Sequence, residues 1–204
     1  MIEEFYNSTS GPCVVIGNGP SLNDIPDSFL DRFPTFGCNT FHMRGYKPTY
    51  FVVADDWIPG LWQKQHEAFR GIPKFCLDRM PSLQNWDGEN IHRWHRKDGA
   101  IWVDRDKYGP TYLNNPGIAF VGIVHAVLQI ADWMGYNKFY LVGCDNTGDS
   151  KHFHEEDLGS EPFRPDLWEM GFAILQTCLV PRAIVNLSTR HRINGLAWAD
   201  WRLL

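Results

Sequence analysis

Residues 14–22, with the sequence VVIGNGPSL, are typical of a strand that runs into a turn able to hold a ligand. Gly17 and Gly19 have no Cβ atom, so they allow a tight turn and the close approach of a ligand to the backbone. Ser21 stands where it could cap a helix, and exposed amides at a helix start attract phosphate. Leu22 occupies the place of the third glycine of the dinucleotide fingerprint, and the P-loop lysine is absent. The segment therefore predicts a non-standard phosphate site or a purely structural turn.

Polar side chains follow the next two predicted strands. Asn39 offers both a donor and acceptors to a base or a ribose, although asparagine at a strand end is also a common turn former. The adjacent carboxylates of Asp55 and Asp56 could hold Mg²⁺ through one or two oxygens, or could cap the helix that follows them. Both interpretations of each segment stay open at the level of sequence.

A third polar segment, residues 145–157, carries His152 and His154. A histidine titrates near neutrality and can remove a proton from a hydroxyl nucleophile, while a neighbouring carboxylate fixes its tautomer. Two histidines separated by one residue, with no further ligand at a fixed spacing, are a weak signature of a metal site. The alternative is a pair of surface-loop histidines. The segment also has five acidic residues: Asp145, Asp149, Glu155, Glu156 and Asp157.

Short apolar runs bounded by turn residues must position these segments. They lack a clean alternation of polar and apolar residues, which is typical of strands buried on both faces. The runs are 13–16, 35–38, 50–54, 74–77, 138–142 and 183–187, and stretches with helical spacing lie between them at 58–69, 118–134 and 165–179.

Strands that alternate with helices predict an α/β fold with a doubly wound, mostly parallel sheet and helices on both faces. Ligands bind beyond the carboxyl ends of the strands in such sheets. We therefore expect the glycine turn, Asn39, the pair of Asp55 and Asp56, and the segment that begins at Asp145 to converge on one crevice.

Residues 81–116 do not follow the alternation of strands and helices. They are polar, aromatic and charged, and only residues 100–103 are strand-like. A long irregular insert in a compact domain is usually a lid or a binding loop. The length of 204 residues suits one domain, so we predict a single domain, 1–204, with a lid at about 81–116.

Charge and composition exclude several classes of function. Nineteen basic against 24 acidic residues give a formal charge of −5, which is unlike the basic surface of a nucleic-acid-binding protein. The longest apolar stretch is interrupted by His125, Gln129 and Asp132, and the start of the chain lacks the pattern of a signal peptide. The five cysteines are far apart and form no CxxC pair, which predicts reduced, buried thiols. We expect a soluble cytoplasmic protein without a transmembrane segment, and a homo-oligomer stays open.

Several short motifs occur in the same order as those of a known family. The chain resembles the bacterial CMP-sialic acid-dependent sialyltransferases typified by the Campylobacter lipooligosaccharide enzyme, over most of its length outside 81–116. It is also similar to hydroxymethylpterin diphosphokinase-like proteins, which share the first turn and a Gly-x-Asp strand end. The motifs are VIGNGPSL at 15–22, GCNTF at 37–41, PGIA at 116–119, LVGCD at 141–145 and VNLS at 185–188.

The resemblance to the sialyltransferases implies a Rossmann-like domain that binds a nucleotide-activated sugar and transfers the sugar to a hydroxyl group. It implies an inverting, metal-independent reaction with a histidine as general base: His154 first, His152 second. The acceptor would be a glycan or a small molecule. The residues it implies at the CMP donor are Gly17, Asn18, Gly19, Ser21, Asn39, Gly117 and Asp145.

One departure from the family and two alternative functions accompany this interpretation. The family has tyrosines after its Gly-x-Asp, whereas this chain has Asn146 and Thr147. A diphosphokinase-like phosphotransferase would need magnesium, for which Asp55, Asp56 and Asp145 are the available carboxylates. A non-catalytic nucleotide-binding module would keep the glycine turn without a proton-transfer group. The transferase interpretation requires no cofactor.

Overall fold

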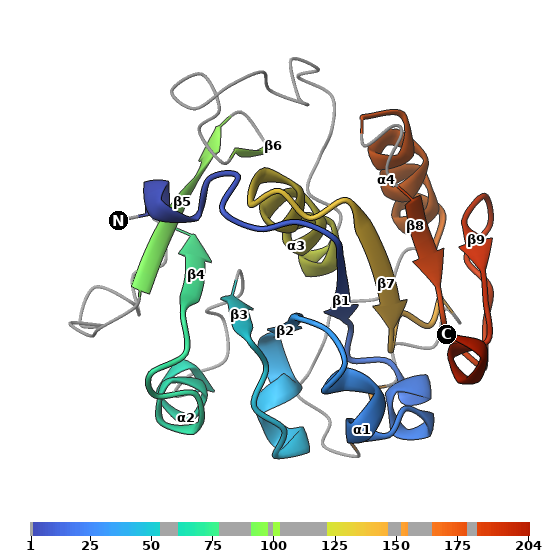
Figure 1. Ribbon diagram of the computed structural model, residues 1–204, viewed down its shortest axis with the longest axis horizontal. Coiled ribbons are helices and arrows are strands. Elements are labelled where there is room, and N and C mark those ends of the chain that lie inside the picture. The colour runs from blue at the N-terminus through green and yellow to red at the C-terminus, as the bar shows by residue number, and fades with distance from the viewer. Residues whose placement is uncertain are drawn as a thin grey trace.

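The computed structural model describes residues 2–53, 61–77, 91–97, 100–102, 122–146, 152–154, 165–178 and 183–204. Nine strands form one sheet with the order β6-β5-β4-β3-β2-β1-β7-β8-β9 (Figure 1). The strands are β1 (Pro12–Ile16), β2 (Thr35–Cys38), β3 (Tyr50–Val53), β4 (Lys74–Leu77), β5 (Ile91–Lys97), β6 (Ala100–Trp102), β7 (Lys138–Val142), β8 (Ala183–Asn186) and β9 (Ala197–Trp198).

Helices and short 3-10 turns connect the strands. The helices are α1 (Asp27–Leu30), α2 (Leu61–Ala68), α3 (Ile123–Trp133) and α4 (Pro165–Cys178). The 3-10 turns are η1 (Ile2–Phe5), η2 (Pro20–Asp24), η3 (Asn39–Arg44) and η5 (Trp201–Leu203). Among the described residues, no helix has the length and apolar character needed to cross a membrane.

The chain winds outward from the centre of the sheet in both directions. It proceeds from β1 to β2, β3 and β4, which pair in parallel, and then returns so that β7 pairs in parallel with the other side of β1. The strand order therefore reverses between β1 and β7, which is the point where open α/β sheets bind ligands. The predicted doubly wound, mostly parallel fold and all six predicted strands are confirmed.

Two strands lie inside the segment that we expected to be an irregular lid. β5 pairs in parallel with β4, and β6 pairs with β5 in the one antiparallel pair of the described strands. The irregularity predicted for 91–97 is therefore wrong, whereas β6 agrees with the strand-like character expected of residues 100–103. β5 is rich in charged and polar residues, and apolar runs detect only strands buried on both faces. The rest of the segment lies outside the described residues, so a lid there stays a prediction.

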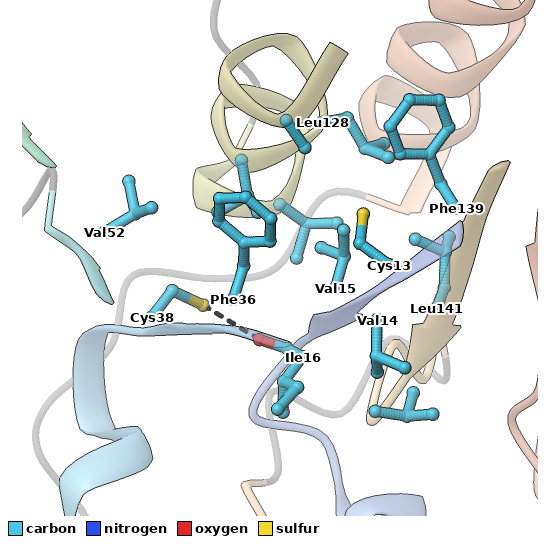
Figure 2. Packing of buried hydrophobic residues seen from close by; sticks show 14 of the residues in the cluster. Cys13, Val14, Val15, Ile16, Phe36, Cys38, Val52, Leu128, Phe139 and Leu141 are labelled. Atoms are coloured by element: carbon cyan, nitrogen blue, oxygen red, sulfur yellow. Dashed lines mark hydrogen bonds between the residues drawn. The ribbon is translucent and has the colours of Figure 1, made fainter. Parts of the chain in front are cut away.

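Strand β1 is buried on both of its faces. Cys13 and Val15 point toward α3, whereas Val14 and Ile16 point to the other side of the sheet, and all four are fully buried (Figure 2). On that other side, Tyr140 of β7 lies beside Val14 and packs against Phe33, with ring centroids 5.2 Å apart. Burial on both faces explains why the apolar runs of the sequence do not alternate with polar residues.

The described cysteine side chains are buried, free thiols, as predicted. They are Cys13, Cys38, Cys76 and Cys144. Burial raises the pKa of Cys13 and of Cys144 well above the usual value. Since the thiolate is the reactive form, these groups act as packing residues.

His125 is a structural histidine in the middle of α3. Its ring packs against Phe172 of α4 at 4.5 Å between centroids, and its Nε2 lies 3.2 Å from the Trp168 carbonyl oxygen. Burial lowers the pKa of His125 to about 4. The side chain is therefore neutral at pH 7 and hydrogen-bonds as a neutral imidazole.

We expect the free energy of unfolding to fall as the pH drops from 6.5 toward 4, and His125→Gln to remove part of that fall. In this range His125 binds a proton in the unfolded state but not in the folded state. The resulting loss of unfolding free energy approaches about 3 kcal/mol near pH 4. Above pH 6.5 the His125 side chain is neutral in both states, so it does not make the free energy of unfolding depend on pH. Urea unfolding of both proteins at pH 7, 5.5 and 4.5 measures the difference. Equal slopes for the two proteins would contradict the assignment.

Candidate functional site

The carboxyl ends of β1 and β7 form two turns that are in direct contact. The amide of Gly17 donates to the Val142 carbonyl at 2.8 Å, and the amide of Gly19 donates to the Gly143 carbonyl at 2.7 Å. A Cβ atom on Gly17 would lie 2.4 Å from the Gly143 oxygen. The glycines therefore allow the two turns to approach each other, whether or not they also allow a ligand to approach.

Asp145 joins three segments of the crevice. Its Oδ2 accepts a hydrogen bond of 2.6 Å from the Ser21 amide, and its Oδ1 accepts one from the Ser188 hydroxyl. The Ser188 hydroxyl also lies 3.1 Å from that of Ser21. Asp145 thus connects η2 to the loop after β8.

The predicted capping role of Ser21 is wrong. A 3-10 turn follows β1, its N-cap is Gly19, and no side chain caps it. Ser21 lies within the turn and is buried. The amides of this turn were expected to attract a phosphate, but the Ser21 amide donates to the carboxylate of Asp145.

Asn18 connects the turn after β1 to the end of β2 and to segment 152–154. Its Nδ2 donates to the Cys38 carbonyl at the end of β2, at 3.1 Å, and its own carbonyl accepts from the Phe153 amide at 2.7 Å. Its Oδ1 is buried and has no hydrogen-bond partner among the described residues. Because a buried acceptor without a partner is costly, this oxygen is suited to a donor group of a ligand.

Asn39 occupies the turn after β2, next to Cys38. Its φ is 44°, in the left-handed region that asparagine tolerates better than most residues. Its carbonyl accepts a hydrogen bond of 2.8 Å from the Gln65 Nε2. The structure thus supports the turn-forming interpretation of Asn39 and also places the residue beside the Asn18 turn, as predicted.

The segment 152–154 packs onto the glycine turn. Besides the bond from Phe153 to Asn18, the Asn23 Nδ2 donates to the Phe153 carbonyl at 2.9 Å. The rings of His152 and His154 lie 5.1 Å apart between centroids, with 34° between their planes. The two rings therefore lie close together, in a segment that is a bend and not a strand.

The two histidines differ in their surroundings. Burial lowers the pKa of His152, and a hydrogen bond from its ring to the Asn18 backbone opposes that shift. In a neutral imidazole with one N–H donating to a carbonyl, the other nitrogen keeps its lone pair. His152 therefore has the properties of a proton acceptor at neutral pH. Both ring nitrogens of His154 are buried.

Sequence reasoning missed several residues that hold the crevice together. Asp24 accepts hydrogen bonds from Thr189 and from the Arg190 guanidinium, and these bonds lower its pKa. Glu169 of α4 accepts a hydrogen bond of 2.9 Å from the side-chain Nδ2 of Asn146. The VNLS motif was the available signal for Ser188, whereas Asn23 and Glu169 have no sequence signal of their own.

Some predicted site residues lie outside the described part of the chain. These are Asp55, Asp56, Gly117, Asp149, Glu155, Glu156 and Asp157. Within the described ranges, no group of three or more His, Cys, Asp or Glu side chains could hold a metal ion.

We expect Asp145→Asn to lower the free energy of unfolding by about 2 kcal/mol, because the carboxylate accepts hydrogen bonds from two separate segments. Asp24→Asn is the matched control, since Asp24 also accepts several hydrogen bonds but lies at the surface. Its ion pair with Arg190 is exposed to solvent screening, so we expect a loss below about 1 kcal/mol. Urea unfolding at pH 7 compares the variants, and an equal or larger loss for Asp24→Asn would contradict this role of Asp145.

Comparison with known proteins finds the same fold in glycosyltransferases. No protein-family model matches the chain, and no curated protein matches its sequence. The sialyltransferase CstII from Campylobacter jejuni has a TM-score of 0.64 at 16% identity, over 93% of this chain and 85% of that one. Cst-I from the same organism, an α-2,3-sialyltransferase, has a TM-score of 0.61 at 18% identity, over 91% and 80%.

The MAf glycosyltransferase from Magnetospirillum magneticum AMB-1 has a TM-score of 0.64 at 16% identity. The match covers 95% of this chain but only 34% of the MAf chain, so this chain spans about a third of that protein's length. Similarity at such identities establishes the fold, and it agrees with the resemblance seen in the sequence motifs.

Proposed function

We propose that this chain is a glycosyltransferase-like enzyme that binds a CMP-activated sugar between β1 and β7 and transfers the sugar to a hydroxyl acceptor. The observation that carries the proposal is the hydrogen bond from Phe153 to Asn18, which fixes the two histidines beside the glycine turn. A proton acceptor and a nucleotide-binding turn then adjoin at the switch point of the sheet. CstII is a structural neighbour whose complexes contain CMP, or CMP with a trisaccharide acceptor.

The proposed reaction is a displacement at the anomeric carbon of the donor sugar. A histidine of segment 152–154 removes the proton of the acceptor hydroxyl as its oxygen attacks the sugar. The bond between the anomeric carbon and the phosphate oxygen breaks, and CMP leaves with the electron pair. The buried Oδ1 of Asn18 is suited to accept a hydrogen bond from the nucleoside. The Ser21 amide already donates to Asp145, so we do not assign it to the phosphate.

The contacts of Asp145 favour transfer over the magnesium-dependent alternative. A diphosphokinase would hold Mg²⁺ through carboxylate oxygens. Both oxygens of Asp145 already accept hydrogen bonds, from Ser21 and Ser188, so metal binding would have to break the connection between η2 and the loop after β8. A binding module without catalysis would bind CMP equally well but would not turn over the donor.

We expect CMP to bind in calorimetry, and CMP-sialic acid to be consumed in the presence of excess EDTA. A CMP-sugar has a single phosphate as its leaving group, which amides and hydroxyls can stabilise without a metal. Parallel titrations with CDP, ATP and GTP test the choice of nucleotide. Strict dependence of turnover on added Mg²⁺ would instead support the diphosphokinase alternative, and CMP binding without turnover would support the binding module.

A further inference from the structure

We propose that Asn23 is a positioning residue, which fixes the 152–154 segment over the nucleotide-binding turn through its side-chain amide. The inference rests on the proposed function, since it assigns Asn23 a role in placing the histidines for proton transfer. The observation that carries it is the 2.9 Å hydrogen bond from the Asn23 Nδ2 to the Phe153 carbonyl. Phe153 lies between the two histidines in the chain.

The main chain of Phe153 is held at both of its polar groups. Its amide donates to the Asn18 carbonyl at 2.7 Å, and its carbonyl accepts from Asn23. Of the two anchors, Asn18 precedes η2 in the chain and Asn23 lies within it. Two hydrogen bonds at one residue fix both the position and the direction of the backbone, and therefore the directions of the neighbouring side chains.

The other polar residues of η2 make hydrogen bonds to other parts of the chain, so Asn23 is the one that bonds to segment 152–154. Ser21 is bonded to Asp145, and Asp24 accepts from Thr189 and Arg190. Asn23 is exposed and its side chain contributes a donor rather than packing. Its replacement should therefore leave the fold intact and loosen the histidine segment alone.

The test compares Asn23→Ala and Asn23→Asp with Asn137→Ala. Asn23→Asp keeps the size of the side chain but removes the donor. Asn137 is an exposed asparagine next to β7, at the opposite end of that strand from the crevice, and serves as the control. The Phe153 amide donates to Asn18, so its hydrogen exchange reports whether the segment stays docked on the turn when the Asn23 bond is lost. Steady-state kinetics with CMP-sialic acid report the consequence for transfer.

We expect both Asn23 variants to accelerate exchange at the Phe153 amide by about tenfold, because losing the bond to the Phe153 carbonyl makes undocking of the segment easier by about the value of one hydrogen bond. We also expect kcat to fall by about 5–20-fold with the donor KM unchanged, because a displaced base affects the transition state and not donor binding. The Asn137→Ala control should show neither change.

Unchanged exchange at Phe153 in Asn23→Ala would overturn the proposal, and so would faster exchange with an unchanged kcat. A loss of kcat in Asn23→Ala that Asn23→Asp fully restores would also overturn it, since the aspartate cannot donate. If the wild-type protein shows no turnover, the proposed function fails. The exchange measurement then still decides whether Asn23 anchors the segment.

Discussion

Gly143→Ala is expected to lower the free energy of unfolding by about 3 kcal/mol. Gly143 has a φ of +62°, and a Cβ atom there would lie 2.6 Å from the Gly17 carbonyl oxygen. The left-handed conformation costs a non-glycine residue about 1 kcal/mol, and overpacking against a fixed backbone adds about 1–3 kcal/mol. The neighbouring atoms belong to the β1 turn, so the strain also disturbs the predicted nucleotide site.

Gly45→Ala is the matched control for this prediction. Gly45 has a φ of +79°, and a Cβ atom there would have no other atom within 4 Å. It therefore carries the conformational cost alone, about 1 kcal/mol. Urea unfolding of both variants separates the cost of the left-handed backbone from the cost of the close contact with Gly17. Calorimetry with CMP reports the effect on the predicted nucleotide site. Equal losses for the two variants would show that the approach of the two turns does not constrain Gly143.

His152→Ala is expected to lower kcat for sugar transfer by about 10²–10⁴-fold, the usual contribution of a general base. Its lowered pKa keeps His152 neutral at pH 7. Because only the neutral imidazole accepts a proton, activity should fall as the pH drops through this pKa, at a midpoint below 6.5. If His152 is the base, His154→Ala should have a smaller effect, whereas the order implied by the motifs, with His154 first, predicts the larger loss for His154→Ala.

His66→Ala provides the control, since His66 lies on α2 and takes no part in the proposed transfer. Its kcat should stay close to that of the wild-type protein. The measurement is release of CMP from CMP-sialic acid with a saturating acceptor, over pH 5–8. A loss confined to His154→Ala would move the base to His154, and unchanged turnover in both crevice variants would contradict a histidine base.

The sequence by itself determined the strands of the central sheet and their order along the chain. Apolar runs such as 13–16 and 138–142 became strands because both of their faces are buried, and burial on both faces requires continuous apolar sequence. The glycine turn and Asn39 were also placed correctly at one edge, because the carboxyl ends of parallel strands meet there. Strand β5 was not predicted, because many of its residues are polar or charged and it has no apolar run.

Only the tertiary structure decided which groups the crevice residues contact. We expected exposed amides at this turn to attract a phosphate. The Ser21 amide instead donates to Asp145, 124 positions away. The bond between Asn23 and Phe153 joins residues 130 positions apart. Contacts over such separations depend on the sheet order and on the direction of each turn, and local composition and periodicity encode neither. The residue types that could do chemistry were therefore readable from the sequence, while their partners were set by the fold that brought β1 and β7 together.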